Sequence, residues 1–83
     1  MPFRPINVRF FAILREQAGV TTLTTDSAAP DAATLYAELQ KRFPGLSFPA
    51  SLLKVSVNER YAELTTPLAA GDRVVFIPPV AGG

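Results

Sequence analysis

The chain has 83 residues and contains neither Cys nor His. This composition excludes cysteine nucleophiles, imidazole bases, and metal sites built from thiolate or imidazole ligands. Eight Lys and Arg residues against seven Asp and Glu give a formal net charge of +1, without a block of like charges, so nucleic-acid binding is not expected. A chain of this length forms one domain with a modest core and no interdomain cleft.

The sequence also indicates the compartment. No apolar run approaches the ~18–20 residues that a membrane span requires, and the N-terminal segment lacks the apolar core of a secretory signal. Small secreted domains usually depend on disulfides, which a chain without Cys cannot form. We therefore expect a cytoplasmic protein without a membrane partner.

The first third of the chain predicts a strand, a short helix and a second strand. Apolar and polar residues alternate from Ile6 to Phe10, as in a half-buried strand. Residues 12–18 are mostly good helix formers and end at Gly19, which suits a left-handed helix cap. The Thr-rich segment 20–25 predicts a strand antiparallel to the first.

One amphipathic helix is predicted next, with Asp31 or Thr34 as its N-terminal cap. It ends before Pro44, which has no amide hydrogen to continue the helical ladder. Glu38 and Arg42 are spaced for an ion pair on the solvent side. The expected apolar stripe consists of Leu35, Tyr36, Leu39 and Phe43.

Further strands are predicted in the last third. Residues 54–58 alternate, Glu59 and Arg60 are expected to turn the chain, and residues 61–64 form a short partner strand. Residues 73–77 contain four consecutive apolar residues, which indicates a central strand covered on both faces. One helix lying across a small sheet is an α+β domain of two layers.

The chain ends in an unusual tail. Pro78 and Pro79 favour an extended backbone that leaves the last strand. Gly82 and Gly83 have no side chains, so they could enter a channel too narrow for any Cβ, and they would present the terminal carboxylate. This pattern suggests a carrier whose C-terminus is the reacting group. We divide the chain into a domain of residues 1–77 and a flexible tail of residues 78–83.

Several motifs agree in order and spacing with a known family. They are Val8-Arg-Phe-Phe-Ala-Ile-Leu-Arg-Glu16, Phe43-Pro-Gly-Leu46, Val57-Asn-Glu, Leu68-Ala-Ala-Gly-Asp72 and Ile77-Pro-Pro-Val-Ala-Gly-Gly83. With them the chain resembles the small, sulfur carrier subunits of molybdopterin synthases along nearly its whole length. The resemblance implies a β-grasp, ubiquitin-like fold, in which one main helix packs on one face of a mixed sheet. The N-terminal Met-Pro-Phe-Arg-Pro segment is longer than expected and receives no role.

The resemblance also implies a mechanism. An E1-like adenylating enzyme would activate the carboxylate of Gly83 with ATP, and a sulfurtransferase or cysteine desulfurase would supply the sulfur that makes it a thiocarboxylate. The tail would then enter the large subunit, where sulfur passes to cyclic pyranopterin monophosphate to form the molybdopterin dithiolene. Two small and two large subunits would form a heterotetramer. The small subunit would bind no cofactor and would act only with the large one.

A partner-binding face is predicted beside the tail. If the first strand turns Phe10 inward, Phe11 faces the opposite side, as do Val75 and Ile77 of the last strand. We expect Phe11, Val75 and Ile77, with Arg15 at the rim, to dock the partners, because exposed apolar groups on a small domain often form interfaces. The alternative is that a loop covers them. The tail residues expected to contact the partner are Pro78, Pro79, Val80 and Ala81.

Two other functions stay open. A sulfur carrier of the same fold could serve thiamin thiazole or cysteine synthesis, although the Pro78-Pro79 pair and the long segment after the helix favour the molybdopterin carrier. A ubiquitin-like modifier, conjugated to lysines through its Gly-Gly end, belongs to a different class.

Overall fold

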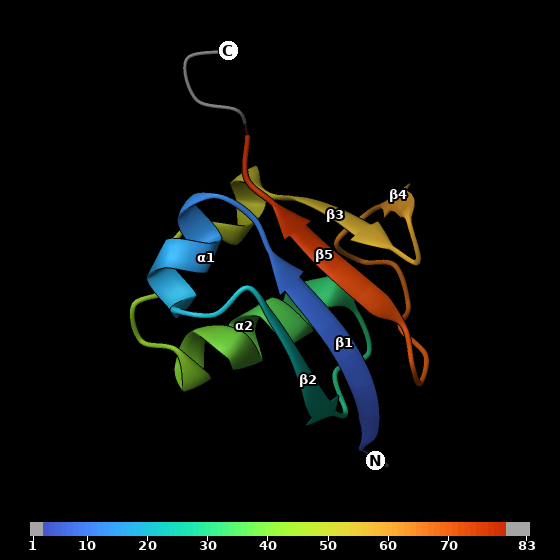
Figure 1. Cartoon of the computed structure of the whole chain (residues 1–83). Coiled ribbons are helices and arrows are strands. Elements are labelled where there is room, and N and C mark those ends of the chain that lie inside the picture. Colours follow the sequence, from blue (N-terminus) through green and yellow to red (C-terminus); the bar gives the residue numbers. More distant parts are fainter. Residues whose placement is uncertain (1–2, 80–83) are drawn as a thin grey trace.

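Alternating and β-branched segments form one mixed sheet, and the amphipathic helix packs across it (Figure 1). The computed structural model describes residues 3–79. Strand order in the sheet is β2-β1-β5-β3-β4, with β1 and β5 parallel and the other neighbours antiparallel. The elements are β1 (Arg4–Phe10), α1 (Ile13–Ala18), β2 (Thr22–Ser27), α2 (Ala32–Arg42), the 3₁₀ turn η1 (Ala50–Leu52), β3 (Lys54–Val57), β4 (Arg60–Ala62) and β5 (Arg73–Ile77). The predicted α+β class is confirmed. None of the helices within residues 3–79 has the length and apolarity that a membrane span needs.

The core lies between α2 and one face of the sheet. Aromatic side chains form its centre: the rings of Tyr36 and Phe76 lie 5.1 Å apart, and those of Phe10 and Phe76 6.2 Å apart. Burial raises the pKa of Tyr36, and its hydroxyl donates to the carbonyl of Phe48 at 2.9 Å. Phe43, predicted as part of the stripe, is only partly buried at the helix end.

The helix caps follow the sequence, but the predicted ion pair does not form. Asp31 caps α2 by accepting a hydrogen bond from the Thr34 amide at 2.8 Å. The Glu38 carboxylate accepts instead from the hydroxyl of Ser27 on β2, at 2.7 Å. The prediction of a Glu38–Arg42 pair is wrong because a partner from another element satisfies the carboxylate.

The hairpin between β3 and β4 turns one residue earlier than predicted. Asn58 and Glu59 both have positive φ, 53° and 71°, as a two-residue type I′ turn requires. Asn58 is held there because its amide oxygen accepts from the Arg73 amide, and its amide nitrogen donates to Asp72, both at 2.9 Å. The turn is therefore fastened to the start of β5.

The N-terminal segment has a structural role that the sequence did not indicate. The Arg4 guanidinium donates to the carbonyls of Ser27, Ala29 and Leu68, the last at 3.1 Å. Ser27 and Ala29 lie at the end of β2 and just after it, whereas Leu68 lies in the loop before β5. The Arg4 side chain therefore connects the start of β1 to these two segments.

The central position of β5 is confirmed, but its predicted double cover is not. Val74 and Phe76 are fully buried against α2, whereas Val75 and Ile77 are partly exposed on the opposite face. Among residues 3–79, no helix lies over that face (Figure 1). The four consecutive apolar residues of β5 therefore serve two environments, the core and the uncovered side of the sheet. We call this uncovered side the open face.

The loop after α2 packs tightly on the end of α1. The side-chain oxygen of Gln17 accepts from the amides of Ser47 and Phe48, both at 3.1 Å. A Cβ added at Gly45 would lie only 2.7 Å from the backbone oxygen of Gln17. Gly45 is thus needed for the close approach of this loop to α1.

Replacing Gly45 by Ala should therefore lower the free energy of unfolding by about 1–3 kcal/mol, because the new methyl group forces two backbone segments apart. Urea unfolding followed by circular dichroism measures the change. As a control, Ala37→Ser at an exposed position of α2 should stay within about 0.5 kcal/mol. Equal midpoints for Gly45→Ala and wild type would contradict the close packing.

Candidate functional site

The open face brings together side chains from four strands. The strand registers place Arg9 beside Val75, Val75 beside Ser56, and Ser56 beside Tyr61. Directly paired residues point to the same side of a sheet, so this row crosses the open face from β1 to β4. Ile77 belongs to the next row, opposite Lys54. The prediction that Val75 and Ile77 point away from the helix is therefore confirmed.

Phe11 stands at the same end of the sheet as Ile77. The last pair between the parallel strands β1 and β5 joins Phe10 to Phe76, and Phe11 and Ile77 follow directly. The Phe11 side chain is 39% exposed, so the alternative of a covering loop is wrong for it within residues 3–79. The Arg9 guanidinium lies 5.0 Å from the centre of its ring, a favourable cation–π arrangement.

A strained turn holds Phe11 in place. Ala12 has φ 53° and ψ −127°, a conformation that glycine adopts at the first central position of a type II′ turn. The Leu14 amide donates to the Phe11 carbonyl at 3.1 Å and closes this turn. Helix α1 starts directly after it, with Leu14 buried and Arg15 exposed. Arg15 thus lies on the short helix that follows Phe11, near the predicted rim.

Two exposed apolar residues of this region were not predicted. Ile13, at the start of α1, is 40% exposed, and Tyr61 is 83% exposed on β4. The alternation of residues 61–64 indicated that Tyr61 lies on one side of a strand. Which face of the sheet Tyr61 occupies depends on its pairing with Ser56. We define the docking patch as Phe11, Tyr61, Val75 and Ile77.

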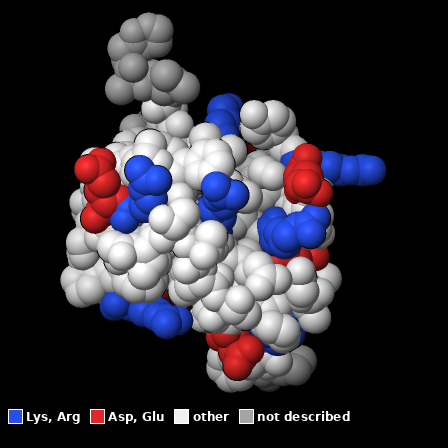
Figure 2. All heavy atoms as spheres, in the orientation of Figure 1, with Lys and Arg blue, Asp and Glu red and all other residues white. Residues whose placement is uncertain are grey.

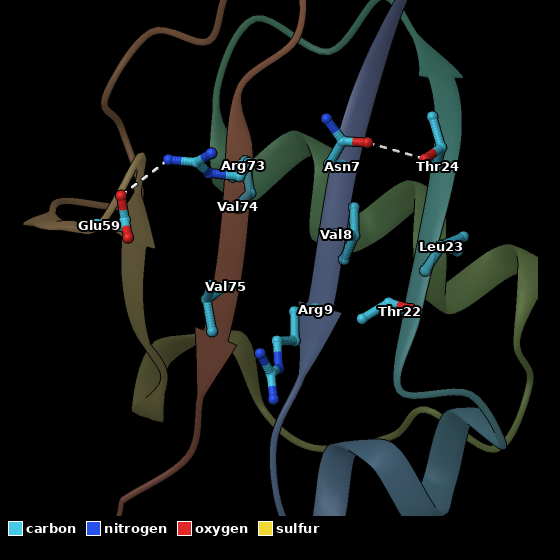
Figure 3. Close-up of a pocket in the computed structure, with 10 residues that line it drawn as sticks. All are labelled: Asn7, Val8, Arg9, Thr22, Leu23, Thr24, Glu59, Arg73, Val74 and Val75. Carbon is cyan, nitrogen blue, oxygen red and sulfur yellow. Dashed lines mark hydrogen bonds and ion pairs between the residues drawn. The ribbon is translucent and has the colours of Figure 1, made fainter.

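A shallow hollow of about 590 Å³ lies on the same face (Figure 3). Figure 3 shows Arg9 extending from β1 toward β5, beside Val75. At its border the Thr24 hydroxyl donates to the side-chain oxygen of Asn7 at 2.8 Å. Arg73 forms an ion pair with Glu59, also at 2.8 Å. The hollow combines apolar and basic side chains, as a surface for a protein partner does.

The described residues include the docking patch and the start of the tail. Within residues 3–79, no group of three or more His, Cys, Asp or Glu side chains could hold a metal ion. Strand β5 ends at Ile77, after which Pro78 is buried and Pro79 is exposed. The predicted reacting residues Gly82 and Gly83, and their neighbours Val80 and Ala81, lie outside the described residues.

Comparisons with known proteins agree on one family. The model of the ThiS family matches residues 8–83. The chain is similar to the molybdopterin synthase sulfur carrier subunit of Mycobacterium tuberculosis, with 35% identity over 94% of this chain and 96% of that protein.

Solved structures are similar over almost their whole length. A chain in the complex of subunits 1 and 2 of the molybdopterin-converting factor from Helicobacter pylori has a TM-score of 0.66 and 31% identity, covering 95% of this chain and 99% of that one. The small archaeal modifier protein 1 of Haloferax volcanii has a TM-score of 0.77 and 28% identity, covering 93% and 99%. These neighbours confirm the predicted β-grasp, ubiquitin-like fold.

The strained turn generates a prediction about stability. Ala12→Gly should raise the free energy of unfolding by about 1 kcal/mol, because relief of the backbone strain exceeds the entropy that glycine costs. Thermal and urea unfolding measure the change. The same substitution at Ala37, exposed within α2, should lower stability by about 1 kcal/mol. Loss of stability in both variants would contradict the assigned turn.

Proposed function

The chain belongs to the ThiS family, and on this premise we propose that it is the sulfur carrier subunit of a molybdopterin synthase. The observation that carries the proposal is the near-complete match to the M. tuberculosis protein of that name, at 35% identity. The Gly-Gly end and the lack of Cys and His support the same role, because a carrier needs one reactive terminus and no catalytic groups of its own.

In this role the carboxylate of Gly83 is the reacting group. A carboxylate is a poor acceptor for sulfur because oxide is a poor leaving group. Attack of its oxygen on the α-phosphate of ATP forms an acyl adenylate and releases pyrophosphate, on the partner activating enzyme. The terminal persulfide sulfur of a sulfurtransferase or cysteine desulfurase then displaces AMP and forms an acyl disulfide. A thiol of the partner attacks that disulfide, which releases the thiocarboxylate of Gly83 and leaves a disulfide on the partner. Activation consumes ATP, which the cytoplasm supplies. A cytoplasmic location is therefore part of the proposed function.

Sulfur transfer then takes place on the large subunit. The thiocarboxylate donates its sulfur to cyclic pyranopterin monophosphate, and two rounds complete the dithiolene of molybdopterin. Each round regenerates the carboxylate of Gly83 by hydrolysis of the acyl intermediate. The two glycines fit this step, since a chain without Cβ atoms passes through the narrowest channel. Acid, base and cofactor groups belong to the partners.

We assign the docking patch to the large subunit. The H. pylori relative is found in a complex of subunits 1 and 2, and the patch lies at the end of β5 from which Pro78 and Pro79 continue toward Gly83. Docking through Phe11, Val75 and Ile77 would aim the tail at its acceptor. The assembly proposed is a heterotetramer of two small and two large subunits.

One observation favours a second candidate. The similarity to small archaeal modifier protein 1, at 28% identity, fits a modifier that is conjugated to lysines through its terminal glycine. Co-expression with the activating enzyme and analysis on denaturing gels separates the two functions. Covalent conjugates that require Gly83 would favour the modifier.

The reacting terminus can be tested by intact mass. Protein co-expressed with its activating enzyme and sulfur source should gain the mass that corresponds to one oxygen replaced by sulfur. The variant that lacks Gly83 should show no such gain and should not restore molybdenum cofactor synthesis in cells without the carrier. Restoration by that variant would refute the proposal, and circular dichroism of both proteins controls for folding.

The docking patch can be tested by Phe11→Asp. Phe11 is 39% exposed and outside the core, so the free energy of unfolding should fall by no more than about 1 kcal/mol, mainly through loss of the cation–π contact with Arg9. It should lose co-purification with the large subunit, because a charge replaces the apolar contact. Thr65→Asp, at an exposed loop position, is the control. A folded Phe11→Asp protein that still binds would contradict the assignment.

A further inference from the structure

We propose that basic side chains around the docking patch recognise carboxylate groups on the large subunit, with Arg9 as the principal contact. This inference rests on the proposed function, because it specifies the chemistry of the surface that faces the patch. The basic residues concerned are Arg9, Arg15 and Lys54.

Arg9 occupies the position closest to the apolar centre. It pairs with Val75 in the parallel register of β1 and β5, and its guanidinium lies over the ring of Phe11 at 5.0 Å. Stacking leaves the edge of a guanidinium free, and five N–H donors lie in that plane. Arg9 is therefore held beside the patch with its donors available to a carboxylate.

The other basic residues enclose the same centre. Lys54 is opposite Ile77, and Arg15 lies on α1, four residues after Phe11. Within residues 3–79, the ion pair between Arg73 and Glu59 is the one that forms, so Arg9 and Lys54 keep their charges for a partner. The whole chain carries a net charge of only +1. The excess of basic side chains is therefore a property of this face and not of the whole protein.

The charge distribution is visible on the surface. Figure 2 views the open face and shows basic side chains across its middle, with acidic ones toward the borders. Apolar residues supply most of the affinity of an interface, while surrounding charges steer association and set orientation. Orientation matters here because the tail must reach its acceptor.

An acidic protein surface suits this face better than a nucleic acid. Phosphate backbones are bound by continuous basic stripes in strongly basic domains, whereas here Val75 and Ile77 separate the cations. Arginine pairs with protein carboxylates in a bidentate fashion. A mixed apolar and basic face therefore matches a protein patch of apolar residues bordered by Asp and Glu.

The test compares two arginines that both stack on phenylalanine. Arg42 lies over the ring of Phe43 at 5.4 Å, but on α2, behind the sheet. Arg9→Glu and Arg42→Glu change the total charge equally. The affinity of each full-length variant for the large subunit from the same organism is measured by surface plasmon resonance at low and high salt.

We expect Arg9→Glu to weaken binding by about tenfold at low salt, mostly through slower association, and to reduce its salt dependence. Arg42→Glu should bind as wild type does. Arg9→Gln should lie between wild type and Arg9→Glu, since it removes the charge without reversing it.

Three results would overturn the inference. If Arg9→Glu and Arg42→Glu bind the large subunit with equal affinity while Phe11→Asp does not bind, the docking patch is supported. Recognition of carboxylates by Arg9 is then refuted. Normal binding in all three variants would refute the patch as well. Unchanged affinity of Arg9→Glu for the large subunit, together with weaker binding to the immobilised activating enzyme or to a single-stranded RNA oligonucleotide in the same assay, would assign the basic residues to another partner.

Discussion

The pairing of β5 between β1 and β3 places Val74 and Phe76 against α2 and leaves Val75 and Ile77 on the other side of the sheet. Among residues 3–79 one main helix packs on the sheet, so one of its two faces is buried by this part of the chain. The same strand thus contributes to the core and to the docking patch. It also leads into Pro78 and Pro79, so core packing determines where the tail starts.

The open face combines apolar area with charge in a chain of only 83 residues. A small domain has little buried surface to spare, and exposed apolar groups such as Phe11 reduce its solubility unless a partner covers them. Stacking of Arg9 on Phe11 shields part of that ring and adds a charge beside it. The strained turn at Ala12 costs stability but fixes the direction in which Phe11 points.

Local patterns predicted the elements well because alternation and helical spacing report directly on which side chains are buried. They placed the apolar side of β1 and the left-handed end of α1 at Gly19, and they gave Asp31 as one of two candidates for the cap of α2. Errors arose where a distant residue decided the outcome. Ser27 attracts the Glu38 carboxylate, and Asp72 and Arg73 hold Asn58 in the turn, so neither result follows from nearby residues.

By itself the sequence determined the α+β class, the absence of Cys and His, and the Gly82-Gly83 pair. It also indicated Phe11, Val75 and Ile77, since alternation assigns each residue to a side of its strand. Only the tertiary structure decided which residues share the open face. Strand order and register bring Arg9, Lys54 and Tyr61 around Val75 and Ile77, because hydrogen bonding between strands, rather than position in the chain, sets the neighbours of a side chain in a sheet.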